Sequence, residues 1–168
     1  DPADGIAPQT TLLTGTTGAQ SATSATFTFS ADEPATFQCR LDGGAYAACA
    51  SPKAYTGLAD GPHTFDVRAT DAAGNVDDSP ASGSWTVDAT APVTSITSAP
   101  SGTVPAPGAT IEFTADEQNS TFQCRLDGGA WTACISPVTL SGLGLGSHTF
   151  QVRATDAVGN TDATPAEA

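Results

Sequence analysis

The chain repeats itself with an offset of 85 residues. The decamer TFQCRLDGGA occupies 36–45 and recurs, letter for letter, at 121–130. At the same offset, HTFDVRATDAAGN at 63–75 matches HTFQVRATDAVGN at 148–160 in 11 of 13 positions. An internal repeat decides the architecture before any other feature, because whatever fold one copy adopts the other must adopt as well. The sequence therefore predicts one structural unit of about 85 residues, built twice.

Two short motifs recur as well and help to place the boundary between the copies. AP-x-T opens each copy at 7–10 and 91–94, and C-x-S-P occurs in each copy at 49–52 and 134–137. We predict repeat 1 over 1–87 and repeat 2 over 88–168. The segment between them, from Asp88 to Pro92, is short and contains proline, so we expect it to be semi-rigid.

Apolar residues within each repeat alternate with polar ones. Phe37, Cys39 and Leu41 alternate with Gln38 and Arg40, which is the period of a half-buried strand. The composition agrees, since Thr, Ser, Ala and Gly dominate and 12 prolines interrupt the chain. The pattern predicts about seven short strands per repeat, in repeat 1 near 9–14, 25–30, 36–42, 45–49, 54–58, 62–70 and 83–88.

About seven strands in about 85 residues, with no helical pattern, predict an all-β fold of two tandem β-sandwiches. Repeat 1 ends with SGSWTVD at 82–88, whereas the sequence of repeat 2 runs only to TPAEA. We therefore predict that repeat 2 lacks its last strand. The sequence is then either a piece of a longer array or is completed by a strand from another chain, because a missing edge strand leaves backbone unpaired.

The motifs FxCRLDGGxWxxCxSP, LxxGxHTFxVRATDxxGN and WTVDxTAP, taken together, resemble tandem immunoglobulin-like repeats of large bacterial surface and secreted proteins. The resemblance covers both repeats. It implies an immunoglobulin- or fibronectin-III-like sandwich that is repeated in an extracellular stalk, adhesin or fibre. It also implies that the chain has no catalytic activity, and that some relatives bind calcium near domain junctions.

The four cysteines form two pairs, Cys39 with Cys49 and Cys124 with Cys134. Their spacing is too wide for the close ligand pairs of zinc sites, and no C-x-x-C indicates a redox-active pair. Across a turn at Gly43–Gly44, residues whose numbers sum to about 88 face each other, which places Cys39 opposite Cys49. We predict two structural disulfides and hence an oxidising, extracellular compartment.

The aspartate turns at 71–75 and 156–160 leave two interpretations open. The first is a plain turn, in which the Asp carboxylate accepts hydrogen bonds from backbone N–H groups. The second is calcium, which prefers carboxylate and amide oxygens. The candidate ligands are Asp71, Asn75, Asp77, Asp88, Asp156, Asn160 and Asp162. Calcium is the one cofactor that the sequence suggests, and we expect the fold to require none.

The formal net charge of −13 argues against binding to nucleic acid and to anionic membranes. No apolar run approaches the roughly 18 residues of a membrane helix. Enzyme activity is not expected, because the lone residues His63 and His148 have no nearby partners for metal or nucleophilic chemistry and no G-x-S-x-G occurs.

Four of the five basic residues fall at two repeated, outward-facing strand positions; they are Arg40, Arg68, Arg125 and Arg153. We expect cross-strand pairs of these arginines with Asp42 or Asp66. Tyr46 and Trp131 share one repeated position after the turn, where they either pack over the hairpin or form an exposed contact surface.

These features predict a non-catalytic extracellular repeat unit of a bacterial surface stalk, adhesin or fibre. Its expected partners are neighbouring immunoglobulin-like repeats or copies of itself. Two alternatives stay open. The chain is a subunit of a self-assembling filament completed by strand donation, or it is an adhesion module that binds a surface glycan or another host or cell-surface ligand.

Overall fold

The protein is described from a computed structural model that covers residues 5–102 and 108–168. The chain divides into two compact units, Asp1–Ala89 and Thr90–Ala168. Strands and turns account for the regular structure of both units. The described residues form no helix, and so none that is long and apolar enough to cross a membrane.

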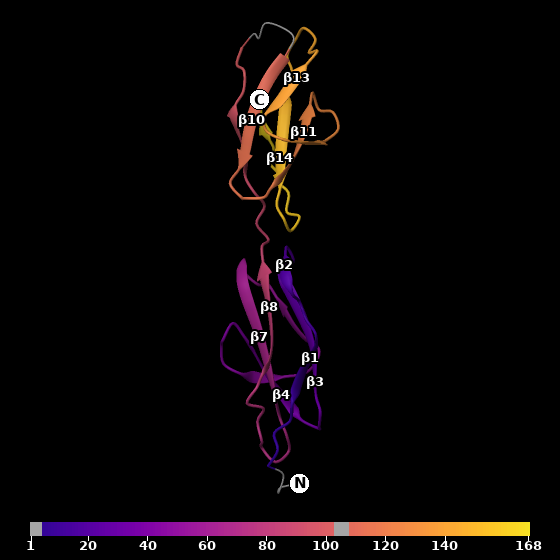
Figure 1. Cartoon of the computed structure of the whole chain (residues 1–168), viewed down its shortest axis with the longest axis vertical. Coiled ribbons are helices and arrows are strands. Elements are labelled where there is room, and N and C mark those ends of the chain that lie inside the picture. Colours follow the sequence, from indigo (N-terminus) through magenta and orange to yellow (C-terminus); the bar gives the residue numbers. More distant parts are fainter. Residues whose placement is uncertain (1–4, 103–107) are drawn as a thin grey trace. The chain divides into compact units, whose positions relative to one another are not determined.

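Unit 1 is a sandwich of two sheets (Figure 1), with the strand orders β1-β3-β6 and β2-β8-β7-β4-β5. The strands are β1 (Thr10–Thr14), β2 (Gly18–Gln20), β3 (Ser24–Ala31), β4 (Thr36–Leu41), β5 (Ala47–Cys49), β6 (Lys53–Thr56), β7 (Gly61–Thr70) and β8 (Ala81–Val87). The predicted two-sheet, all-β architecture is confirmed.

Aromatic side chains from both sheets fill the core of unit 1. Phe27 on β3 stacks on Phe65 on β7, with ring centroids 4.2 Å apart and planes 11° from parallel. The ring of Trp85 on β8 has its centroid 5.1 Å from that of Phe27. These three side chains are at most 3% exposed, so the alternation in the sequence marks the inward-facing residues correctly.

The sequence pattern did not predict β2, which pairs in parallel with β8. The chain leaves β1 in one sheet and reaches β2 in the other by way of Gly15. A Cβ atom at Gly15 would lie 2.5 Å from the ring of Phe27, so the crossing requires glycine at this point. Since Gly18–Gln20 is short and lacks apolar alternation, it carries no signal for a strand.

Unit 2 repeats this arrangement, with sheets ordered β13-β10-β9 and β12-β11-β14-β15. Its strands are β9 (Thr94–Ser98), β10 (Gly108–Ala115), β11 (Thr121–Leu126), β12 (Thr132–Cys134), β13 (Val138–Ser141), β14 (Phe150–Thr155) and β15 (Ala166–Glu167). Among its described residues, the buried core cluster consists of Ile111, Phe113, Cys124, Phe150 and Val152.

The prediction that repeat 2 lacks its last strand needs correction. β15 pairs antiparallel with β14 and sets Ala166 opposite Val152, as β8 sets Ala81 opposite Val67 in unit 1. Ala168 then exchanges two backbone hydrogen bonds with Phe150, of 2.8 and 3.0 Å. β15 therefore occupies the place of the first residues of β8, since Ala166 and Glu167 are the counterparts of Ala81 and Ser82 at the 85-residue offset.

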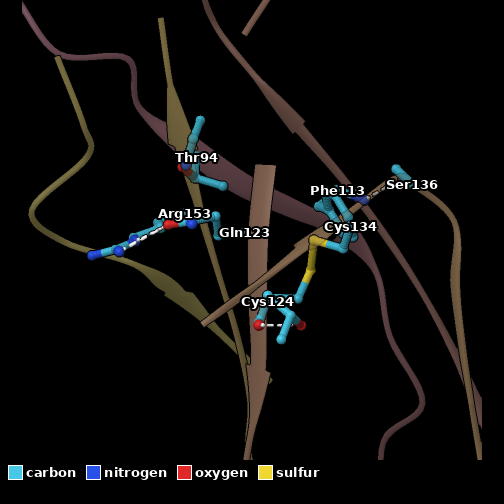
Figure 2. The surroundings of a disulfide bond; sticks show 9 residues. Thr94, Phe113, Gln123, Cys124, Cys134, Ser136 and Arg153 are labelled. Atoms are coloured by element: carbon cyan, nitrogen blue, oxygen red, sulfur yellow. Dashed lines mark hydrogen bonds between the residues drawn. A yellow bond between two sulfur atoms is a disulfide. The ribbon is translucent and has the colours of Figure 1, made fainter. Parts of the chain in front are cut away.

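Both predicted disulfides are present, with Cα atoms 5.8 Å apart in each pair. Figure 2 shows the bond between Cys124 and Cys134. The predicted register was wrong, however. Cys39 lies opposite Ala47, so the numbers of paired residues sum to 86 instead of 88. The bond between Cys39 and Cys49 therefore joins diagonal neighbours on the two strands. The reason is the turn: Gly44 N–H donates to Leu41 O at 2.9 Å, and the returning chain rejoins β4 only at Ala47.

Replacing Cys39 and Cys49 together by serine should destabilise unit 1 by about 3 kcal/mol, because the closed loop restricts the unfolded chain. Thermal unfolding followed by circular dichroism measures the change. The Cys124/Cys134 double variant is the matched comparison, since its loop has the same separation of 10 residues. Two melting curves like that of the oxidised parent would contradict a structural role for these bonds.

Candidate functional site

A buried carboxylate and a threonine hydroxyl join the two sheets of unit 1. Asp77 is 2% exposed, and its Oδ2 accepts a 2.8 Å hydrogen bond from Thr10 N–H on β1. Thr10 Oγ1 in turn accepts a 2.9 Å bond from Ala69 N–H on β7. Ser79 donates its N–H and its hydroxyl to Asp77 Oδ1, both at 2.8 Å. Because β1 and β7 belong to different sheets, we call this group the inter-sheet clip.

Unit 2 contains the same inter-sheet clip. Asp162 is 5% exposed and accepts a 2.9 Å bond from Thr94 N–H on β9. Thr94 Oγ1 accepts a 2.8 Å bond from Ala154 N–H on β14, and Thr164 donates twice to Asp162. Thr10 and Thr94 are the last residues of the two AP-x-T motifs. Sequence reasoning found the motif but not this role, for which its recurrence was the only signal.

Burial and hydrogen bonding act in opposite directions on the clip carboxyls. Desolvation alone would raise the pKa of Asp77 and Asp162. The donated hydrogen bonds outweigh it, since they favour the ionised form, and the pKa of both carboxyls lies below its ordinary value. Each clip is therefore an ionised carboxylate surrounded by donors.

The aspartate turns have the hydrogen bonds of the plain-turn interpretation. Asp71 Oδ1 accepts 2.8 Å bonds from Ala73 and Asn75 N–H, and Asn75 Nδ2 donates to its Oδ2 at 2.7 Å. Asp156 and Asn160 repeat the arrangement in unit 2. The hydrogen bond from the Asn75 side chain is the largest of the effects that lower the pKa of Asp71.

Within each unit, the structure brings together one pair of the candidate calcium ligands, Asp71 with Asn75 in unit 1 and Asp156 with Asn160 in unit 2. Asp77 and Asp162 instead belong to the inter-sheet clips. The backbone N–H of Asp88 donates to Gln20 O at 2.9 Å. Calcium binding stays a prediction, and a cation at either turn would have to replace N–H donors that now contact the Asp oxygens.

Each histidine contacts two loops of its own unit. One is the turn after β4 or β11, and the other is the segment that precedes β7 or β14. His63 Nδ1 lies 2.8 Å from Asp42 Oδ2, and its Nε2 lies 2.8 Å from Ala59 O. Both partners are acceptors, so only the protonated ring donates to both. The Ala59 carbonyl and the Asp42 carboxylate accordingly raise the pKa of His63. His148 makes the equivalent contacts, and its pKa is also raised, with the Asp127 carboxylate as the leading cause.

Arginines and one aromatic ring pack together on the outer face of the larger sheet of unit 1. Arg40 Nε donates to Asp66 Oδ2 at 2.7 Å, and Arg68 donates twice to Gln38 Oε1 at 3.1 and 2.9 Å. The guanidinium carbons of Arg40 and Arg68 lie 4.6 and 4.0 Å from the centroid of the Tyr46 ring. The expected pair with Asp66 is confirmed for Arg40, but Arg68 donates to a glutamine instead of an aspartate. Tyr46 packs within its own unit.

Unit 2 has the same group around Trp131, whose ring centroid lies 4.5 Å from Arg125 Cζ and 4.4 Å from Arg153 Cζ. Arg153 donates to Gln123 (Figure 2), and Arg125 donates to Gln151 at 2.6 Å. Stacking of a sugar or a base requires an open aromatic face. The contacts of Tyr46 and Trp131 are instead made with arginines of the same sheet.

The serine of each C-x-S-P motif also bonds within its unit. Ser51 Oγ accepts a 2.9 Å hydrogen bond from Phe29 N–H on β3. Ser136 Oγ accepts the same bond from Phe113 N–H on β10, close to the disulfide in Figure 2. The segment after each disulfide is thereby held to the opposite sheet.

No protein-family model matches the chain, and no curated protein sequence is similar enough to count as a match. Among solved structures, fibronectin(III)-like modules of Clostridium thermocellum CbhA are similar, with 18% identity, a TM-score of 0.46 and coverage of 95% of this chain and 92% of that one. A 1.5-MDa bacterial ice-binding adhesin has 16% identity and a TM-score of 0.47, over 97% of this chain and 64% of its own.

A Ca²⁺-stabilised adhesin with which an Antarctic bacterium binds ice has 20% identity and a TM-score of 0.45, over 97% of this chain and 49% of its own. The chain thus spans less than two thirds of both adhesin chains. The assignment of the fold rests on the strands and registers described above.

Replacing Asp77 by alanine should lower the stability of unit 1 by about 1–3 kcal/mol, because the partly buried hydrogen bonds from the N–H groups of Thr10 and Ser79 would lose their acceptor. Urea unfolding measures the loss. Asp78→Ala is the matched control, since the neighbouring side chain is exposed and its loss should have little effect. Equal losses for the two variants would show that the clip does not stabilise the sandwich.

The stability of both units should fall as the pH rises above about 6.5, the ordinary pKa of histidine. The pKa of each histidine is raised in the folded state. Its contribution to the free energy of unfolding is therefore fully present below the unfolded-state pKa of about 6.5, and it is lost as the pH rises through the folded-state pKa. Melting temperatures measured between pH 5.5 and 9 test this. The double variant His63→Gln/His148→Gln should show a flatter pH profile, and a profile as steep as that of the parent would contradict the assignment.

Proposed function

We propose that the chain is a non-catalytic structural module of an extracellular bacterial surface protein, such as a stalk, adhesin or fibre. In this role each unit is a folded spacer whose core, disulfide and clips resist unfolding. The proposal extends the resemblance found in the sequence to a mechanical function.

The observation that carries the proposal is the use of the repeated polar side chains inside their own unit. The AP-x-T threonine bonds the opposite sheet, the C-x-S-P serine bonds a core strand, and the Asp of each D-x-x-G-N bonds its own turn. The repeated arginines pair with neighbouring strands. A binding module would reserve repeated residues for its ligand, whereas these residues hold the fold together.

The two disulfides support an extracellular location, because such bonds persist in oxidising compartments. The net charge of −13 supports solubility of a long array of modules. Neighbouring repeats or copies of the chain are the partners that this role requires.

Two other roles have less support. Recognition of a surface glycan or host ligand would be expected to use Tyr46 and Trp131, but arginines of the same sheet contact both rings. Assembly of a filament by strand donation would need a partner strand beside β14, where β15 already pairs with Gln151 and Val152.

Single-molecule stretching of the chain between two handle domains tests the mechanical role. We expect two discrete unfolding events, each releasing about 25 nm, at about 3.5 Å for each residue freed. Gradual lengthening without discrete events would contradict a load-bearing module.

The same measurement after reduction is the control for the disulfides. Each event should lengthen by about 3–4 nm, because each bond encloses a sequence separation of 10 residues. Repeating the measurement in millimolar calcium and in chelator tests the predicted cation. Unchanged unfolding forces would end the calcium prediction and leave the structural role intact.

A further inference from the structure

One turn of unit 2 differs from its counterpart in unit 1 by an added residue. The segment 115–122 reads ADEQNSTF, whereas unit 1 has ADEPATF at 31–37. The longer turn leads into Asn119-Ser120-Thr121, which is the one Asn-x-Ser/Thr sequence in the chain. That triplet, with any residue except proline in the middle, is the acceptor sequence for N-linked glycans. Whether this asparagine is placed as an acceptor depends on the exposure and bonding of its amide.

The turn connects the two sheets of unit 2. β10 ends at Ala115 and β11 begins at Thr121, so 116–120 lie outside the sheets. Asn119 and Thr121 are both exposed. The Ser120 hydroxyl donates to Glu117 O at 3.0 Å and closes the turn without using the asparagine. An enzyme can therefore reach the Asn119 amide without opening a pair of strands.

The Asn119 side chain is not used inside its unit. It makes no hydrogen bond to any residue that the structure describes. The other two asparagines of the chain, Asn75 and Asn160, each donate a side-chain N–H to an aspartate of their own turn at 2.7 Å. Within the described residues, the amide of Asn119 is thus the asparagine amide that is open to covalent chemistry.

The backbone conformation of Asn119 explains the turn but not its side chain. Its φ is 63°, in the left-handed region that asparagine adopts more readily than most residues. Asp42 and Asp127 share this conformation with φ of 50°, and their carboxylates accept hydrogen bonds from the backbone N–H groups of Thr64 and Thr149. Asn119 has the conformation without a bond of this kind, so its amide serves no purpose in the fold.

The rest of the acceptor sequence is accessible as well. Thr121 Oγ1 donates to Thr155 O at 3.3 Å, which is a long hydrogen bond at the surface. Such a bond is easily exchanged for one to an enzyme. Glu117 stands two residues before Asn119, so a carboxylate, an amide and a hydroxyl occur at every second residue from 117 to 121.

We propose that Asn119 is an acceptor site for an N-linked glycan, and that segment 117–121 is bound by a bacterial oligosaccharyltransferase. The donor is an oligosaccharide carried on a polyprenyl diphosphate. The Asn119 amide nitrogen forms a bond to C1 of the first sugar and loses one proton. The bond from C1 to the diphosphate oxygen breaks, and the diphosphate leaves with that electron pair. The inference rests on the proposed function, because this transfer takes place outside the cytoplasm.

A glycan at this turn would serve the structural role of the module. Glycans are bulky and solubilising, and exposed loop tips are preferred sites of proteolytic cleavage. The equivalent turn of unit 1 contains Pro34, which restricts the backbone. The glycan would shield the longer turn of unit 2, which has no proline.

Expression of the full chain in the periplasm of a bacterium that carries an oligosaccharyltransferase and its lipid-linked oligosaccharide tests the proposal. The intact mass should rise by one glycan per chain, and peptide mapping should locate the glycan on Asn119. An unchanged mass, while an established acceptor protein in the same cells is modified, would overturn the proposal. So would glycans found only on serine or threonine.

Point variants test each part of the acceptor sequence. Asn119→Gln and Thr121→Val should abolish the added mass, because they remove the acceptor amide and the hydroxyl, and Thr121→Ser should retain it. Glu117→Gln should lower the occupancy, and occupancy equal to that of the parent would remove Glu117 from the bound segment. Melting curves of the variants establish that each is folded. A Thr121→Val chain modified as fully as the parent would overturn recognition of this sequence.

The equivalent turn of unit 1 provides a matched test in the same chain. Replacing Pro34-Ala35 by Gln-Asn-Ser gives both units the sequence ADEQNSTF. The intact mass should then rise by two glycans, whereas a single glycan would overturn the assignment of recognition to the turn. The stretching experiment uses the unmodified chain, so failure of the acceptor site and failure of the structural role are distinguishable.

Discussion

Each sandwich depends on a buried, ionised carboxylate that links its two sheets. Apolar burial is not directional, so a core of Phe and Val favours two stacked sheets without fixing their alignment. Asp77 and Asp162 supply that alignment, because each binds an edge strand of one sheet beside a strand of the other. Taking a carboxylate out of water is costly unless donors surround it, and three hydrogen bonds donated by Thr10 and Ser79 offset that cost for Asp77. The clip is stable only when the whole fold is in place.

Short-range patterns in the sequence predicted most of the strands, but they could not identify partner residues that lie far apart in the chain. β4 and β7 follow from alternation alone, because one face of each is buried. β2 was missed, since its pairing with β8 is set by a partner far along the chain. Thr10 and Asp77 are 67 residues apart, so no local pattern could connect them. The disulfide partners were predicted correctly from a register that was wrong by two, because a diagonal pair also brings its Cα atoms within bonding reach.

The polar sites show the same limit. Asp and Asn close together in a turn suit both a cation and a ring of N–H donors, and spacing alone cannot show which of these contacts the carboxylate. The structure surrounds Asp71 with donors from its own turn. The repeated arginines were easier to interpret, since the partner of Arg40 lies directly across the strand pair. That Ala59 and Asp42 are both acceptors for His63 depends on a loop conformation that the sequence does not reveal.

Differences between the units concentrate at one end of the sandwich. The clips and the hairpins recur almost unchanged, whereas Phe27 becomes Ile111, Tyr55 becomes Leu140 and Asp60 becomes Leu145. In unit 1, Asp60 accepts a 2.8 Å hydrogen bond from the backbone that follows β8. Leucine cannot make that bond, so Leu145 cannot hold the chain at this end of unit 2 as Asp60 does in unit 1. The two units therefore share one scaffold and differ in the contacts at this end.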